Sequence, residues 1–493
     1  MIVNFVKKIS DMKKYLLYTM TAVLAAGVAT GCKDFLTEEP PLEQSTEITL
    51  STYEGLNNAT AGAYSRLASS GWYGGEFILL NELKTANGKK FVGSSYDTGR
   101  MNDWYNINYN ANTTSSLFGN AYYVISQANN IIDNLTEDKG DAQDLNNLRA
   151  ECLFLRALSY FDLVRTYGQP YTRDNGASAG VPVVLHTDSD DQSPRSTVAD
   201  VYSRIVSDLT EAESIIDPAY RRSGGTDAKA WASVDAIRAL LSRVYLYMGQ
   251  WQNAADYATL VIESGNYTLW SADALSSTEA GINPYMTDAT SEVIFEICGL
   301  NTNSYDPGLD GLWAMTAGSY GDAGCASDVR DLFEESDVRG GLFVHDPKNA
   351  GEDVWHTSKY RGKGIGSSVD YTNVMILRLS EMYLNRAEAL VNGAAVQGCT
   401  ATADLQTIAD ARGAAVQPAT RDGVFTERWK ELNWEGHLWF DLGRTGRDMT
   451  RTDVANSTVP SSVSFSSEPN VWAMPIPLSE LEVNPNLTQN PGY

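Results

Sequence analysis

The stretch IRALLSRVYLYMGQWQNAADYATLVIESGNY, residues 237–267, decides the fold class. It carries the spacing of a tetratricopeptide repeat, in which two helices pack against each other, at Tyr245, Gly249, Trp251, Ala254 and Ala258. Small alanines on the second helix let the first approach closely, the tyrosine fills the groove, and the glycine permits the turn. The stretch therefore predicts one helix pair, and stacked pairs of this kind form an α-solenoid.

Helical periodicity dominates the chain beyond this pair. Apolar residues recur at three-to-four spacing over 53–67, and similar faces occupy 117–135, 143–167, 198–216, 231–248, 251–264, 374–391, 402–412 and 425–442. Residues 147–168 with 198–216, and 374–391 with 402–412, are expected to form further helix pairs. The sequence thus predicts a mainly α fold, an α-solenoid of tetratricopeptide-type helix pairs.

Four segments between these helices lack helical periodicity and are rich in Gly, Asn, Asp, Ser and aromatic residues. They are 69–116, 169–195, 265–373 and 443–475. Runs such as EVIFEI (292–297) predict a few short strands within them. Long loops in a compact protein are usually functional, so these segments are expected to form a loop-rich ligand-binding face on the helical scaffold. With 43% hydrophobic residues and no linker-like stretch, residues 32–493 are predicted to be a single body.

The N-terminal segment resembles the signal peptide of a bacterial lipoprotein. Lys13 and Lys14 precede a short apolar run, and small residues lead to Cys32. The run is too short and too polar to span a membrane. We therefore expect residues 1–31 to be a signal peptide and Cys32 to carry the lipid anchor, with Met1 or Met12 as the start.

Net charge excludes some classes of partner. Loss of residues 1–31, with their four lysines and one aspartate, would take the formal charge from −25 to −28. Nucleic-acid phosphates need Lys and Arg for neutralisation, so nucleic acid is not an expected partner. The same negative charge disfavours electrostatic binding to anionic lipid. The acyl chains are therefore expected to attach the protein to the membrane.

The other cysteines, Cys152, Cys298, Cys325 and Cys399, show no metal-ligand spacing such as C-x-x-C. No zinc site is expected. A disulfide between Cys298 and Cys325 is chemically possible outside the cytoplasm, but free thiols are favoured.

Six blocks resemble one known family, in the same order along the chain. They are RALSYFDLVRTYGQP (156–170), GVPVV (180–184), STVADVYSRIVSDLTEA (196–212), MILRLSEMYLNRAEAL (375–390), ERWKELNWEGHLWFDLGR (427–444) and MPIPLSELEVNPNLTQNPGY (474–493). Together with the lipoprotein signal, they resemble the SusD/RagB family of Bacteroidetes outer-membrane lipoproteins. The resemblance implies a cell-surface nutrient-binding protein that captures oligosaccharide or polysaccharide and delivers it to a SusC-like TonB-dependent transporter.

Most charged residues of these blocks are predicted to belong to the scaffold rather than to a catalytic site. Arg156 and Arg165 are expected to bond carbonyls or carboxylates, and buried or half-buried ion pairs are expected from Glu388, Arg428, Glu431, Glu435, Asp441 and Arg444. Glu431 and Glu435 lie one turn apart, so they would point the same way from one helix. The two carboxylates of a glycosidase must instead flank the scissile bond, so we predict no enzyme.

Other catalytic and metal-binding patterns are weak. The four histidines, His186, His345, His356 and His437, show no H-E-x-x-H spacing, and neither G-x-S-x-G nor a P-loop is present. DPGLDG (306–311) offers oxygen ligands for Ca²⁺ but lacks the fuller D-x-D-x-D-G pattern. No cofactor is expected, and a structural Ca²⁺ is an unsupported possibility.

Two loops carry the expected ligand site. A sugar site stacks Trp or Tyr on the apolar ring face and places polar side chains at the ring edge. YDTGRMNDWYNINYN (96–110) and DGLWAMTAGSY (310–320) combine such residues, and SSGWYGGE (69–76) is a weaker third candidate. The candidate residues are Arg100, Asn102, Asp103, Trp104, Tyr105, Trp313, Tyr320 and Trp72.

Three alternatives remain open at this point. The same lid role with peptide cargo would suit backbone hydrogen bonding and the acidity of the chain. A surface glycoside hydrolase would release reducing sugar, whereas a binding protein would not. A purely structural envelope lipoprotein would leave both aromatic loops without a ligand, and the sequence does not identify the glycan.

Overall fold

The computed structural model describes residues 46–91, 97–113, 115–187, 192–222, 229–276, 283–298, 311–316, 320–346, 353–362 and 373–493. The chain divides into two compact units, residues 1–55 and residues 56–493, and the features that follow lie in the second except for those of residues 46–55. The predicted signal peptide and Cys32 lie outside the described residues, as does DPGLDG except for Gly311. The predicted anchor and the single-body boundary therefore stay predictions.

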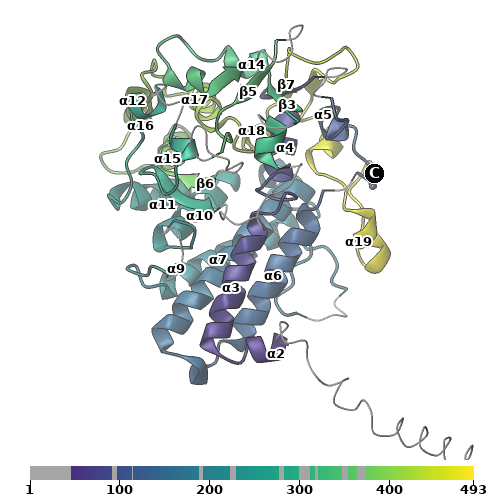
Figure 1. Cartoon of the computed structure of the whole chain (residues 1–493), viewed down its shortest axis with the longest axis vertical. Helices are drawn as coiled ribbons and strands as arrows, with labels where there is room; N and C mark the ends of the chain where they lie inside the picture. The colour runs from purple at the N-terminus through teal and green to yellow at the C-terminus, as the bar shows by residue number, and fades with distance from the viewer. Residues whose placement is uncertain are drawn as a thin grey trace, which may run out of the picture. The chain divides into compact units, whose positions relative to one another are not determined.

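Long helices pack one on the next through the second unit (Figure 1). They are α3 (Tyr53–Leu67), α6 (Leu117–Asn134), α7 (Ala142–Tyr167), α9 (Val198–Ile215), α10 (Val234–Tyr247), α11 (Trp251–Glu263), α15 (Leu379–Val391), α16 (Ala401–Arg412) and α17 (Arg421–Leu432). Contacts run in sequence from α6 through α7, α9, α10 and α11 to α15, which packs on both α16 and α17. The predicted mainly helical solenoid is confirmed, including the three expected helix pairs.

The α10 and α11 pair has the geometry expected of a repeat. Ala254 and Ala258 are completely buried, which lets α10 approach closely enough for Ser242 Oγ to donate to the Ala254 carbonyl at 2.9 Å. The Tyr245 ring stacks on another ring in α11, Tyr257, at a centroid distance of 5.7 Å. Gly249 turns the chain at φ +70°, a conformation that other residues rarely adopt.

Capping residues in the sequence also mark the starts of α7 and α9, which form the longest helix pair. The Asp141 side chain caps α7, and Thr197 with Asp200 forms a capping box at the start of α9. The two helices are tied by Arg156, whose Nε and Nη2 donate to Asp208 at 2.8 and 2.7 Å. This pairing of a guanidinium with a carboxylate confirms the scaffold role predicted for Arg156.

Short elements occupy the segments between the long helices. The helical ones are α2 (Thr46–Thr49), α4 (Glu76–Leu83), α5 (Asn102–Tyr105), α8 (Tyr171–Asp174), α12 (Ala272–Ser276), α13 (Leu312–Thr316), α14 (Ser327–Arg330), α18 (Leu438–Arg444) and α19 (Leu478–Val483). The 3₁₀ turns are Glu137–Lys139, Pro284–Met286, Val338–Leu342 and Pro469–Trp472. The predicted loop regions thus hold many single turns of helix.

The strands form small antiparallel pairs in the described residues. They are β1 (Gly88–Lys90) with β3 (Ala323–Cys325), β2 (Val293–Ile297) with β6 (Val374–Arg378), β4 (Phe343–His345) with β5 (Trp355–Thr357), and β7 (Met449–Thr450) with β8 (Ser462–Val463). In the first pair Gly88 faces Cys325 and Lys90 faces Ala323. The strand predicted from EVIFEI is confirmed as β2.

Three expectations about elements were wrong. Residues 374–378 form β6 rather than helix, because a short, wholly buried apolar run has no period that separates strand from helix. The predicted helix over 425–442 is broken between α17 and α18, where Trp434 and Gly436 have φ values of +58° and +79°. Helix α4 was missed because almost every residue in it is buried, which removes the amphipathic signal.

Candidate ligand-binding site

A cleft of about 350 Å³ opens beside α5. It is lined by Glu76, Leu80, Arg100, Met101, Asp103, Trp104, Asn112 and Thr113. Three of these residues, Arg100, Asp103 and Trp104, were predicted from the sequence. Leu80 was missed, and Glu76 entered only as the end of the weaker candidate stretch 69–76, because the sequence gives no sign that α4 lies next to the 96–110 loop.

The backbone around α5 adopts uncommon conformations that the C-terminal segment holds in place. Met101 and Ile107, on either side of the helix, have φ values of +59° and +51°. Arg451 Nη2 donates to the Tyr105 carbonyl at 2.6 Å, and the Ala455 amide donates to the Tyr105 hydroxyl at 2.9 Å. Figure 1 shows the yellow C-terminal segment beside α5. Such strain persists only where the surrounding structure imposes it, and it concentrates at functional sites.

Two carboxylates line the cleft with defined orientations. Glu76 Oε2 accepts hydrogen bonds from the Ser116 amide at 3.0 Å and from Ser115 Oγ at 3.3 Å. Asp103 is exposed, and its Oδ2 accepts from Thr113 Oγ1 at 3.4 Å. An ionised carboxylate accepts and does not donate, so this wall offers acceptors to the hydroxyl groups of a ligand.

The Trp104 indole supplies the apolar surface of the cleft. The side chain is half-buried and packs against the main hydrophobic core. Its Nε1–H is shielded from solvent and has no hydrogen-bond partner among the residues that the structure describes.

The structure brings the two predicted loops together. The Arg100 guanidinium lies 4.5 Å from the centroid of the Tyr320 ring. Asp322, two residues after Tyr320, is buried. Its carboxylate accepts hydrogen bonds from the Thr98 amide at 3.1 Å, from the Thr98 hydroxyl, and from Lys90 Nζ at 3.3 Å. Lys90 Nζ also donates to the Arg100 carbonyl. Burial lowers the pKa of Lys90, and the Asp322 carboxylate opposes that shift. Sequence reasoning missed this anchor, whose members are far apart in the chain.

Trp313 and Asn102 lie near the cleft without lining it. Trp313 is half-buried on α13, and the Ala314 carbonyl accepts from the Tyr320 amide at 3.1 Å, which connects α13 to the Arg100 contact. Asn102 begins α5 and is also half-buried. The ligand contacts predicted for these two residues stay predictions.

Two candidate residues belong to the core. Trp72 has no exposed surface, its Nε1 donates to Asp162 Oδ2 at 2.7 Å, and its ring stacks on Tyr73. Tyr105 is 1% exposed, with its hydroxyl bonded to the backbone of the C-terminal segment. Neither ring has a face left for a ligand, so both assignments were wrong in this structure. A tryptophan next to glycines resembles an exposed loop in sequence even when its loop is folded inward.

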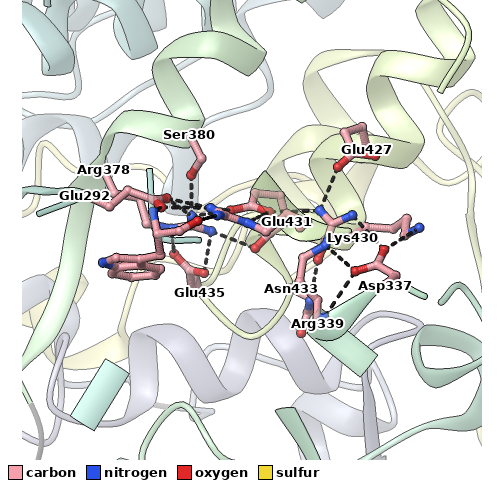
Figure 2. A network of polar contacts seen from close by, with 12 residues as sticks. Glu292, Asp337, Arg339, Arg378, Ser380, Glu427, Lys430, Glu431, Asn433 and Glu435 are labelled. Carbon is pink, nitrogen blue, oxygen red and sulfur yellow. Dashed lines mark hydrogen bonds and ion pairs between the residues drawn. The ribbon is translucent and has the colours of Figure 1, made fainter. Parts of the chain in front are cut away.

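The carboxylates that suggested a glycosidase belong to a buried ion-pair network (Figure 2). Glu431 accepts from Arg378 at 2.5 Å, from Arg339 at 2.8 Å and from Arg412 at 2.8 Å. Burial alone would raise the pKa of Glu431, but the three guanidinium groups hold it well below the usual value. Glu435 similarly pairs with Arg378 and Lys359, which lower its pKa against the effect of burial.

The other predicted ion pairs are also confirmed. Arg444 bonds Glu388 at 2.5 Å and Asp441 at 2.7 Å, and Arg428 bonds Asp441 at 2.8 Å. Arg165 bonds Asp162 at 2.6 Å. The Arg444 and Arg428 pairs tie α15, α17 and α18 to one another, whereas the Arg165 pair lies within α7, as expected for scaffold residues.

In the described part of the chain, no group of three or more His, Cys, Asp or Glu side chains could hold a metal ion, and Cys152, Cys298, Cys325 and Cys399 form no disulfide with one another. None of the described helices combines the length and the apolar character that crossing a membrane requires.

Comparison with known proteins supplies relatives along nearly the whole chain. Residues 34–246 match the family described as "Starch-binding associating with outer membrane", and residues 347–493 match the SusD family. A crystal structure of a SusD superfamily protein from Bacteroides vulgatus superposes with a TM-score of 0.78 at 30% identity, over 90% of this chain and 99% of the other.

Named relatives show the same relationship. The SusD-like protein P38 of Formosa agariphila is 24% identical over 98% of this chain and 100% of its own. The starch-binding protein SusD of Bacteroides thetaiotaomicron is 25% identical over 75% of this chain and 77% of its own.

Proposed function

The chain belongs to the SusD/RagB family, and on that premise we propose that it is a glycan-binding lipoprotein of the bacterial outer membrane. The observation that carries the proposal is the cleft beside α5. It combines the Trp104 indole with the Glu76 and Asp103 carboxylates, the Asn112 amide and the Thr113 hydroxyl. An indole matches the apolar face of a sugar ring, and the polar groups match its hydroxyls. The name of the related SusD, a starch-binding protein, supports the same ligand class.

The proposal includes an anchor and a partner. Cys32, at the end of the signal-like segment, would be acylated and would hold the protein on the outer membrane, facing the exterior. A SusC-like TonB-dependent transporter would receive the captured oligosaccharide, and this chain would act as a binding protein rather than an enzyme. The ion pairs of Glu431 and Glu435 support a non-catalytic role, because both carboxylates are paired with arginine or lysine side chains.

The test is a glycan and peptide array, followed by calorimetric titration of the best ligand against Trp104→Ala. Removing a stacking aromatic at the centre of a site commonly costs at least ~2 kcal/mol, or roughly thirtyfold in affinity. Trp104→Ala should show that loss of affinity in the folded protein, together with a lower melting temperature because the indole also packs against the core.

Trp251→Ala is the matched control, because Trp251 is also half-buried but lies in the α10 and α11 repeat. It should lower the melting temperature and leave affinity unchanged. Selective binding of peptides on the array would replace the glycan assignment with peptide cargo, and normal glycan affinity of Trp104→Ala would remove the cleft from the proposal.

A further inference from the structure

We propose that the cleft beside α5 selects an uncharged glycan and rejects an anionic one, such as a sulfated or uronic-acid glycan. This inference rests on the proposed function and adds the charge class of the ligand. The residues that line the cleft carry two carboxylates, Glu76 and Asp103, against one guanidinium, Arg100. The wall on which a sugar would lie is therefore net negative.

The carboxylates are oriented for hydroxyl donors. Glu76 is held by Ser115 and Ser116 at the start of α4, and Asp103 is held by Thr113. Because ionised carboxylates only accept hydrogen bonds, their natural partners are the hydroxyl groups of an uncharged sugar. A sulfate or carboxylate group of a ligand in the same place would offer no hydrogen-bond donor and would be repelled by the like charge. Such repulsion strongly disfavours binding of an anionic ligand.

The nearby cations do not reverse this field. Arg100 lies over the Tyr320 ring, so part of its surface is covered. Lys90 is 1% exposed and pairs with Asp322, so its ammonium group is withdrawn from the cleft. The whole chain adds a formal charge of −25, which repels anionic polymers at longer range.

The first experiment presents the full-length protein in detergent micelles to an array of uncharged, uronic-acid and sulfated oligosaccharides. Uncharged oligosaccharides should give the strongest signals. Stronger binding of a sulfated or uronic-acid oligosaccharide would overturn the charge assignment while leaving the glycan function intact. Absence of all oligosaccharide binding would overturn the proposed function itself, so the two failures are distinguishable.

The second experiment tests whether the two carboxylates cause the selection. For the best uncharged ligand and its sulfated derivative, Glu76→Gln with Asp103→Asn should reduce the preference for the uncharged form at least tenfold. Asp103→Asn alone should also reduce the preference for the uncharged form. Because Asp103 is exposed, this single variant should fold and keeps the test valid if Glu76→Gln unfolds.

The matched control removes the same charge elsewhere. Glu137→Gln with Asp144→Asn changes two exposed carboxylates near the start of α7 and should leave the preference within twofold of the original. Raising the salt concentration should strengthen the wild-type interaction with the sulfated ligand and leave the uncharged ligand unaffected, because salt screens only the charged pair. A preference that survives the cleft variant, or falls equally in the control, would refute the inference.

Discussion

Two regions of this protein concentrate carboxylates and cations, and they use them in opposite ways. In the buried network, the cations Arg339, Lys359, Arg378, Arg412 and Lys430 pair with the buried carboxylates Glu292, Asp337, Glu427, Glu431 and Glu435, and Lys430 also pairs with the less buried Glu334. In the cleft, Glu76 accepts from Ser115 and Ser116, and Asp103 accepts from Thr113. A carboxylate buried among cations is structural, whereas a carboxylate that lines a cleft meets whatever ligand enters it.

Helix α4 carries one carboxylate at the cleft and one in the core within eight residues. It supplies Glu76 and Leu80 to the cleft. Its second half is core, where Glu82 accepts from Asn87 Nδ2 and from the Gly436 amide, both at 2.6 Å. Burial raises the pKa of Glu82 to about 7, against the effect of these hydrogen bonds. The role of a carboxylate on this helix is therefore set by what surrounds it and cannot be assigned from its position in the helix alone.

The largest effect on stability is expected from breaking the buried ion-pair network. Glu431→Gln leaves three guanidinium groups without their shared carboxylate, and breaking a buried ion pair costs about 3–5 kcal/mol. The folded-state pKa of Glu431 is depressed, so its contribution is present above the unfolded pKa and is lost as pH falls. The variant should unfold several kcal/mol more easily at pH 7, as measured by denaturant titration.

Ligand affinity separates this effect from one on the site. The folded fraction of Glu431→Gln should bind glycan with wild-type affinity. Glu263→Gln, at an exposed position at the end of α11, controls for the change in charge and should alter neither property. A selective loss of affinity in Glu431→Gln would mean that the network acts on the ligand and would erase the contrast between the two regions.

An intermediate effect is expected at Lys84, a buried cation without a matched anion in the described structure. Its Nζ lies 4.5 Å from the centroid of the Trp439 ring, and burial lowers its pKa to about 7. Between pH 7 and the unfolded value of 10.5 the unfolded chain binds more protons, so stability rises with pH. Lys84→Met abolishes this rise, and its stability relative to wild type should fall by roughly 2 kcal/mol between pH 7 and pH 9.

Denaturant titrations of both proteins at the two pH values measure this difference directly. Lys89→Met is the control, because Lys89 is a half-buried neighbour that pairs with Asp453. If Lys84→Met and wild type respond identically to pH, the Lys84 amine is not desolvated, and an unmatched charge then costs the core no more than it costs the cleft.

The sequence predicted the scaffold well because the scaffold depends on local, periodic signals. The spacing of Tyr245, Gly249 and Ala254 predicts a helix pair directly, since each of these residues acts within one helix pair. The ion pairs of Arg428 and Arg444 could also be inferred, because charged residues on an apolar helix face need partners.

The cleft was predictable only in part, because it is assembled from distant segments. Residues 100–104 were identified from their mixture of aromatic and polar side chains, but Glu76 reaches them only through the packing of α4. Composition could not separate the core rings of Trp72 and Tyr105 from the half-buried ring of Trp104. Burial depends on how the loops fold back on the scaffold, which no local pattern specifies.

The smallest expected effect tests whether the cleft depends on its anchor. Thr98 donates to the buried Asp322 through both its amide and its hydroxyl, and this holds the loop that carries Arg100. Thr98→Val keeps the shape of the side chain and removes the hydroxyl, a change worth about 1 kcal/mol for one hydrogen bond. Because the bond positions the loop, the loss should appear as a several-fold weaker glycan affinity with little change in melting temperature. Thr98→Ser restores the hydroxyl and should recover affinity, whereas Thr407→Val removes an exposed hydroxyl on α16 and should have no effect on binding. Equal affinity in Thr98→Val and wild type would show that the cleft keeps its geometry without the Thr98 hydroxyl, through the Thr98 amide, the Lys90 and Asp322 pair and the Arg100 and Tyr320 contact.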